Sequence, residues 1–167
     1  MNKLEVFFDY VCPFCLEGHE NLMDVIGSYP QVEVVWCPCE AHPRPETYGP
    51  HSDLCIQGLY YAMDTGADLA LYHERMYKGC INDKIDIENT DIVVDWVSDI
   101  VDAAGLKEAL VSGRYSEKLL QANDYAYEQS GVWAVPSYRM NGEKLDAVEE
   151  VGVTKEQLKA FLDKTVR

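Results

Sequence analysis

The cysteines of this chain are the residues whose types and spacing are best suited to chemistry. Cys12 and Cys15 are separated by Pro13 and Phe14, in the order Cys-Pro-Phe-Cys. Residues i and i+3 of a helix lie on one face with their Cβ atoms roughly 5–6 Å apart, so such a pair needs only a small adjustment to form a disulfide. The spacing therefore predicts a redox pair that opens and closes without moving the fold.

The segments around this pair predict which thiol attacks. Residues 4–9 are mostly large and apolar, which indicates a buried strand, and apolar residues at helical spacing over 12–28 indicate a helix. Pro13 suits the first helical turn, where its missing N–H costs nothing. Cys12 should cap that turn, where unpaired backbone N–H groups and the positive end of the helix dipole favour a thiolate. We expect Cys12 to be the nucleophile and Cys15 to be the buried resolving thiol.

A second close pair, Cys37 and Cys39, leaves another chemistry open. Together with Cys12 and Cys15 it forms the series C-x2-C-x21-C-x-C, which is similar to a four-thiolate zinc pattern. Zinc knuckles favour glycine-rich turns, whereas both pairs here enclose or flank proline. We expect no metal and no organic cofactor, and we interpret Cys37 and Cys39 as reduced thiols in a loop beside the active site. A zinc-stabilised binding module is the alternative.

The order of the remaining elements predicts an α/β fold with a helical insert. Residues 32–36 indicate a second buried strand, which completes a βαβ unit with a parallel strand pair. Residues 135–140 return to strand character before Asn141-Gly142, the preferred dipeptide of a type I′ hairpin turn. A capping box, Thr154 with Gln157, begins a closing helix.

The middle of the chain is too long for an ordinary crossover between strands. Ninety-eight residues lie between the second and third predicted strands, where a dozen or more suffice. We therefore predict one domain from residues 1–50 and 130–167, and an all-helical insert over 51–129.

Apolar stripes predict the helices of this insert. The clearest stripe is continuous from Ile92 to Val101 and closes at Gly105. Cys55 and Cys80 also lie on apolar stripes, which indicates that they pack in the core.

Composition limits the possible partners. The chain has 167 residues, of which 47% are hydrophobic and 26% charged, and its 14 basic and 29 acidic residues give a net charge of −15. This balance argues against nucleic acid and anionic lipid as partners. No apolar run has the length of a membrane span, and the first residues do not have the pattern of a signal peptide, so we expect a cytoplasmic protein.

Two motifs resemble one family. Residues 8–15, Phe-Asp-Tyr-Val-Cys-Pro-Phe-Cys, resemble the opening of the DsbA-like thioredoxin-fold oxidoreductases, especially their cytoplasmic FrnE-like branch. Residues 131–138, Gly-Val-Trp-Ala-Val-Pro-Ser-Tyr, resemble the segment that precedes the β-hairpin in that family. The resemblance implies a thioredoxin-like fold, a mixed sheet from βαβ and ββα units. It also implies a cis Val135–Pro136 bond that faces Cys12, with the Val135 backbone available to an extended substrate.

The expected activity is disulfide exchange with protein or small-molecule thiols and disulfides, as an oxidase, reductase or isomerase. Glutathione transferases of the kappa class and 2-hydroxychromene-2-carboxylate isomerases share this fold with its insert, so a glutathione-dependent enzyme is the alternative. Those relatives use a serine-type site, and the pair of Cys12 and Cys15 argues against their chemistry.

Overall fold

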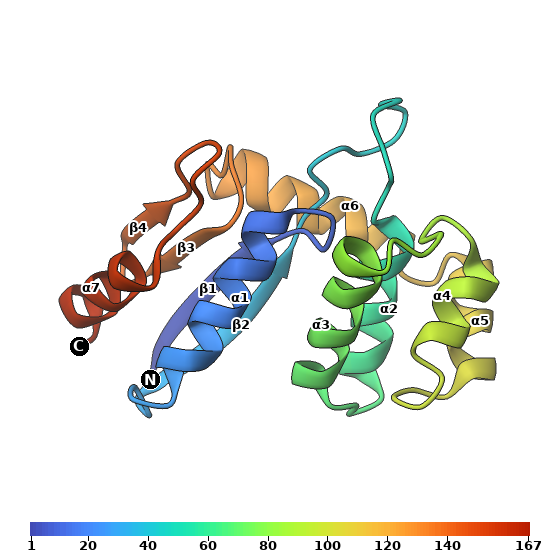
Figure 1. The fold of residues 1–167 in the computed structure, drawn as a ribbon, viewed down its shortest axis with the longest axis horizontal. Helices are drawn as coiled ribbons and strands as arrows, with labels where there is room; N and C mark the ends of the chain where they lie inside the picture. The colour runs from blue at the N-terminus through green and yellow to red at the C-terminus, as the bar shows by residue number, and fades with distance from the viewer.

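The fold combines one β-sheet with a block of helices beside it (Figure 1). The computed structural model describes residues 1–167 and contains four strands, seven α-helices and two π-helical turns, η1 and η2. In chain order the elements are β1 (Asn2–Phe8), α1 (Pro13–Ile26), β2 (Val32–Pro38), α2 (Asp53–Asp64), α3 (Leu69–Tyr77), η1 (Lys78–Asn82), α4 (Thr90–Trp96), α5 (Ala103–Ser112), α6 (Ser116–Asp124), η2 (Tyr125–Gln129), β3 (Ser137–Met140), β4 (Glu143–Asp146) and α7 (Lys155–Thr165).

The strands form one mixed sheet in the order β2-β1-β3-β4. β1 and β2 are parallel and are joined by α1, whereas β3 is antiparallel to both β1 and β4. The predicted βαβ and ββα units are therefore confirmed. So is the hairpin turn, in which Asn141 has a φ of 52° and Gly142 a φ of 82°, as a type I′ turn requires.

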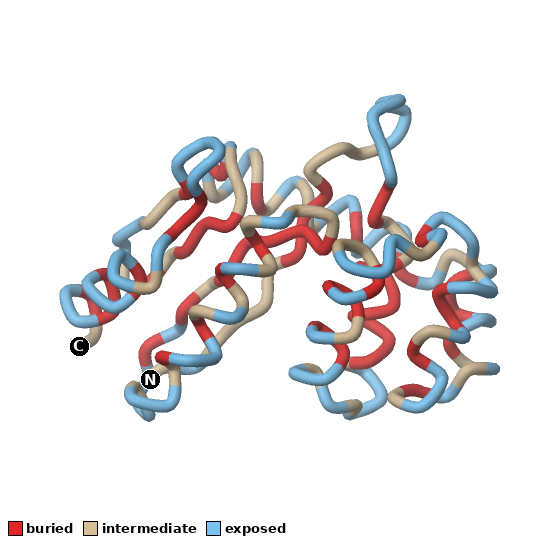
Figure 2. Tube along the Cα trace, viewed as in Figure 1, coloured by how far each residue is buried: buried red, intermediate tan, exposed pale blue.

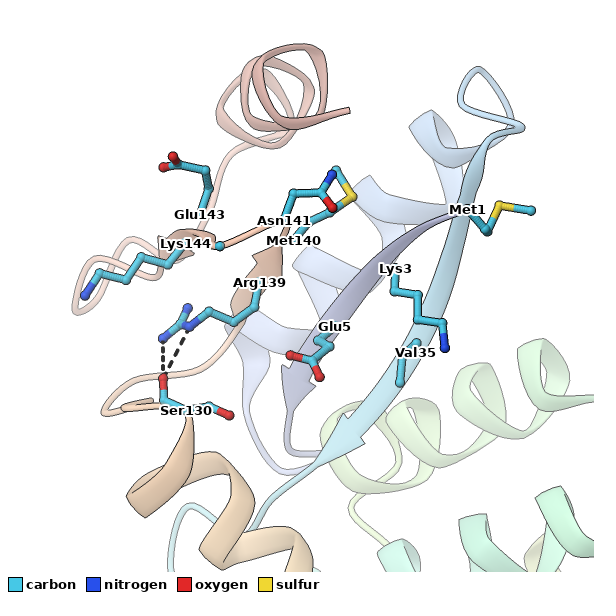
Figure 3. A pocket seen from close by; sticks show the side chains of 11 residues that line it. Met1, Lys3, Glu5, Val35, Ser130, Arg139, Met140, Asn141, Glu143 and Lys144 are labelled. Carbon is cyan, nitrogen blue, oxygen red and sulfur yellow. Dashed lines mark hydrogen bonds between the residues drawn. The ribbon is translucent and has the colours of Figure 1, made fainter. Parts of the chain in front are cut away.

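The two faces of the sheet are covered unequally. Leu4, Val6 and Phe8 of β1 are buried on one face, where α1 crosses the sheet and packs against α7 (Figure 1). On the opposite face Phe7, near the end of β1, is buried against Ala126 and the ring of Tyr125 from η2. Further back, Lys3 lines an open cavity of about 750 Å³ over the sheet (Figure 3). The second face is thus covered mainly near the start of α1.

All regular elements between β2 and β3 are helical, and they share the core of the sheet. One cluster of 33 buried residues includes Leu4 and Leu22 beside the sheet as well as Leu59 and Leu106 in the helical block (Figure 2). The predicted division into residues 1–50 with 130–167 and 51–129 stays a prediction, because this shared core marks no boundary. No helix has both the length and the apolar character needed to cross a bilayer.

The prediction of one continuous helix through the stripe from Ile92 to Val101 is wrong. α4 ends at Trp96, and α5 begins only after Asp102. The Asp102 carboxylate accepts the backbone N–H of Gly105 at 3.0 Å, which satisfies a donor at the start of a new helix. Val93, Val97 and Val101 of the stripe are buried, but residues 97–101 form turns and do not continue the helix.

This cap generates a stability prediction. Asp102→Ala should lower the free energy of unfolding by about 1 kcal/mol, because the N–H groups at the start of α5 lose their acceptor. Asp102→Asn is the matched control, since it retains an oxygen acceptor and should lose much less. Urea denaturation followed by circular dichroism measures both values. Equal losses in the two variants would contradict the capping role.

Candidate active site

Cys12 lies at the N-cap of α1, immediately after the turn that follows β1. Its backbone is extended, with φ −94° and ψ 115°, and Pro13 occupies the first helical turn as predicted. The Cys12 Sγ atom accepts the backbone N–H of Cys15 at 3.3 Å. The sulfur therefore takes the place of a capping oxygen, where negative charge is stabilised.

The two thiols of this pair have opposite acid–base properties. The Cys15 thiol donates to Cys12 and is the main cause that lowers the pKa of Cys12, and the N–H groups of Cys15 and Phe14 act in the same direction. Burial and the nearby Asp9 oppose this lowering. Cys15 is only 1% exposed, and burial raises its pKa well above the usual value. Of the two thiols, Cys12 therefore loses its proton more readily, while Cys15 holds its proton.

Val135 and Pro136 meet this pair from the segment before β3. Their peptide bond is cis, as the resemblance implies, and the Val135 carbonyl oxygen lies 3.6 Å from the Cys12 sulfur. Gly18, on α1, makes room for this segment, because a Cβ atom there would lie 3.1 Å from Pro136 Cγ. The structure thus brings together the two motifs that are far apart in the sequence.

Phe14 contacts a different part of the chain. Gly152, in the loop between β4 and α7, has a φ of 77°, and a Cβ atom there would lie 3.2 Å from the Phe14 side chain. This loop therefore packs against the residue between the two cysteines.

A cavity of about 350 Å³ opens beside Cys12. Pro13 and Val135 form its near side, and His42 and Tyr48 come from the loop 39–52, which connects β2 to α2. A group bound in this cavity would lie next to the Cys12 sulfur.

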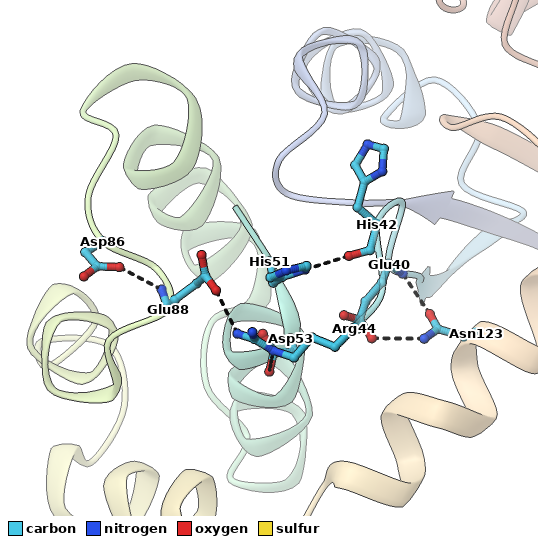
Figure 4. Close-up of polar contacts among 8 residues, drawn as sticks. All are labelled: Glu40, His42, Arg44, His51, Asp53, Asp86, Glu88 and Asn123. Carbon is cyan, nitrogen blue, oxygen red and sulfur yellow. Dashed lines mark hydrogen bonds and ion pairs between the residues drawn. The ribbon is translucent and has the colours of Figure 1, made fainter. Parts of the chain in front are cut away.

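The loop 39–52 is anchored to distant parts of the chain (Figure 4). The Glu40 N–H donates to Asn123 Oδ1 at 2.8 Å, and Asn123 Nδ2 donates back to the Glu40 carboxylate at 3.0 Å. Closer to the cavity, His51 Nδ1 lies 2.8 Å from the carbonyl oxygen of His42. These contacts hold the far wall of the cavity in place.

Asp9 links this loop to the end of β1. Its carboxylate accepts the N–H of Ala41 at 2.8 Å, and its backbone carbonyl accepts the N–H of Cys12 at 3.2 Å. Burial raises the pKa of Asp9. Sequence reasoning identified the segment that contains Asp9 as a strand but gave no role to its carboxylate.

Sequence reasoning also missed an aromatic cluster beneath the site. Tyr10 Oη lies 2.8 Å from His73 Nδ1, and both residues are fully buried. Burial lowers the pKa of His73 to about 3, so its ring is neutral at physiological pH. No local signal connects His73 to a partner 63 residues away in the chain.

The four thiols of the alternative zinc set are not brought together. No group of three or more His, Cys, Asp or Glu side chains is placed to hold a metal ion. Cys39 is buried in a small cluster with Phe7 and Val132, and Cys37 is half-buried. Burial raises the pKa of each of these two thiols to about 12, so they stay protonated.

One family model matches nearly the whole chain. The family model of a DSBA-like thioredoxin domain matches residues 3–159. Uncharacterized protein YwbO of Bacillus subtilis (strain 168) is 26% identical in an alignment that covers 81% of this chain and 84% of YwbO.

Solved structures share the fold at low sequence identity. A probable DsbA oxidoreductase from Streptomyces coelicolor matches with a TM-score of 0.82 and 14% identity, over 99% of this chain and 90% of that chain. Oxidised BdbD from Bacillus subtilis matches with a TM-score of 0.77 and 14% identity, over 98% of this chain and 86% of that chain. The predicted thioredoxin-like fold with a helical insertion is therefore confirmed.

The contact between the two thiols generates a pH prediction. Cys15→Ala should raise the pKa of Cys12, because it removes the main cause of the lowering. Cys15→Ser retains a hydroxyl donor and should raise this pKa less. The rate of Cys12 alkylation by iodoacetamide, followed by peptide mass mapping against pH, measures each value. In the alanine variant alkylation should fall off at a higher pH than in the native chain, and identical profiles would refute the role of the Cys15 thiol.

Proposed function

Because the chain belongs to the family of DSBA-like thioredoxin domains, we propose that it is a protein disulfide oxidoreductase that acts through Cys12 and Cys15. The observation that carries the proposal is the pairing of a helix-capping thiol of lowered pKa with a buried thiol of raised pKa. Because attack on a disulfide requires a thiolate, this pairing assigns attack to Cys12 and resolution to Cys15.

The exchange proceeds through a mixed disulfide. The Cys12 thiolate attacks one sulfur of a substrate disulfide, and the other sulfur leaves and takes up a proton. Cys15 then gives up its proton, attacks Cys12 and displaces the second substrate sulfur. The protein loses two electrons and gains the Cys12–Cys15 disulfide, while the substrate becomes a dithiol. The reverse sequence oxidises a substrate dithiol, and the same steps need no metal or organic cofactor.

Exposed aromatic side chains support a protein or peptide substrate. Tyr48 is 67% exposed and lines the cavity beside Cys12, while Trp133 is 72% exposed and lines a second cavity together with Val135. Large apolar side chains left exposed around a site are typical of an interaction surface. The backbone of Val135 would pair with the extended substrate between them. A cytoplasmic location is part of the same proposal.

Trapping experiments test the roles of the two cysteines. Cys12→Ser should reduce the rate of disulfide exchange to the uncatalysed rate, because no thiolate remains to attack. Cys15→Ser should accumulate a mixed disulfide on Cys12, since nothing resolves it. Intact mass and peptide mapping after thiol alkylation distinguish these states. Two results with the native chain would support the glutathione-dependent alternative. In one, Cys12 and Cys15 never pair in glutathione redox buffers; in the other, the protein conjugates glutathione to an electrophile.

The substrate surface generates a separate prediction. Trp133→Ala should raise the KM for an unfolded disulfide-containing protein by up to about tenfold, the loss expected from one exposed aromatic anchor. The rate with glutathione disulfide should change much less, because a small disulfide covers less of the exposed Trp133 side chain than an unfolded protein does. Val111→Ala is the matched control, since Val111 is exposed on α5 at the far end of the helical block (Figure 1). Equal effects on both substrates would argue against a protein-binding role.

A further inference from the structure

A second pair of cysteines lies in the helical block. The Sγ atoms of Cys55, on α2, and Cys80, in η1, are 3.9 Å apart, and both thiols are free. A disulfide has an S–S distance of about 2.05 Å, so each sulfur must move by only about 1 Å for the bond to form. The apolar stripes indicated core packing for both residues, but they did not indicate that the two sulfurs face each other.

The two sulfurs differ in access. Cys55 is fully buried, and its carbonyl oxygen accepts the Tyr72 hydroxyl at 2.7 Å, which holds this part of α2 in place. Cys80 is partly exposed and lines a cavity of about 450 Å³. A disulfide reagent that enters this cavity reaches Cys80 and not Cys55.

This cavity adjoins the one beside Cys12. Val11 and Pro13, which flank Cys12 in the chain, line both cavities. Lys84 supplies a positive charge to the lining at Cys80. A small anionic thiol or disulfide therefore has access to both cysteine pairs from neighbouring openings.

The surroundings of Cys55 fit the role of the resolving thiol, while Cys80 is the accessible one. The hydrogen bond with Cys80 and, next, burial raise the pKa of Cys55 well above its usual value. Cys55 thus keeps its proton beside the Cys80 sulfur, 3.9 Å away. This is the same division between an accessible and a buried thiol as at Cys12 and Cys15, built from other helices. The π-helical turn that carries Cys80 is a rare geometry that is often found at functional sites.

We propose that Cys55 and Cys80 form a second dithiol–disulfide pair, which is oxidised by a small-molecule disulfide such as glutathione disulfide. The Cys80 thiolate attacks one sulfur of glutathione disulfide and releases one glutathione thiolate, which takes up a proton. Cys55 then gives up its proton, attacks the Cys80 sulfur and displaces the second glutathione. Two protein thiols are oxidised to one disulfide, and one glutathione disulfide is reduced to two glutathione molecules.

The new bond would join α2 to the turn that ends α3. These helices already pack against each other, so the bond would form without a change in their arrangement. A cross-link between residues 55 and 80 restricts the unfolded chain, and the oxidised protein should therefore unfold at a higher temperature. The pair would act as a redox-controlled cross-link that stabilises the helical block.

The first experiment uses the native chain and does not depend on any variant folding. The protein is equilibrated in buffers of increasing glutathione disulfide, quenched in acid, alkylated and mapped by peptide mass. A Cys55–Cys80 disulfide should appear and should revert in excess reduced glutathione. The same map reports Cys12–Cys15 separately. If only Cys55–Cys80 forms, the proposed function fails and this inference stands. If Cys55 and Cys80 remain free in every buffer while Cys12–Cys15 oxidises, the inference of a second redox pair is overturned.

Single substitutions then test the order of the two steps. Cys55→Ser should accumulate one glutathione on Cys80, because the resolving thiol is absent, whereas Cys80→Ser should carry none on the buried Cys55. Cys37→Ser is the matched control and should form the Cys55–Cys80 disulfide as the native chain does. Circular dichroism checks that each variant is folded. Glutathione attached to Cys55 in a folded Cys80→Ser variant would overturn the assignment of Cys80 as the attacking thiol.

Discussion

The unpaired backbone N–H groups at the start of α1 are the constraint on which the candidate site depends. A helix leaves its first N–H groups without intrahelical partners, so an acceptor must be supplied from outside. Here the N–H of Cys15 is shared between the Cys12 carbonyl oxygen at 3.0 Å and the Cys12 sulfur at 3.3 Å. A thiolate accepts these N–H groups better than a thiol does, so the position of Cys12 at the start of α1 favours its thiolate form.

The sheet brings the rest of the site to this helix start. α1 begins just beyond the carboxyl end of β1, and β3 lies antiparallel beside β1, with Ser137 opposite Phe7. This register places Val135 and Pro136, which directly precede β3, at the same end of the sheet as Cys12. The absence of a side chain at Gly18 then lets the segment approach α1. A helix start and a strand start thus meet because two neighbouring strands run in opposite directions.

The helical block contributes to the site as well as to the core. The Tyr10 ring lies 5.1 Å from Tyr77 and 6.1 Å from Tyr72, so α3 packs directly beneath the turn that presents Cys12. The connection into α2 forms the outer wall of the cavity beside Cys12. The same block carries Cys55 and Cys80, whose sulfurs face each other across two packed helices. The helical block and its connection to β2 therefore supply three things: the outer wall of the cavity beside Cys12, the packing beneath it and the second cysteine pair.

The sequence by itself determined the features that depend on neighbouring residues. Helical spacing and Pro13 predicted where α1 begins, Asn141-Gly142 predicted the hairpin, and the paired cysteines predicted the redox chemistry that we propose. Local periodicity failed where α4 ends at Trp96, inside the apolar stripe, and a new helix begins only after its cap at Asp102. Only the tertiary structure decided which distant groups meet: His73 with Tyr10, and Cys80 with Cys55. Such pairs carry no local signal, because their distance is set by how the whole core packs and not by their spacing in the chain.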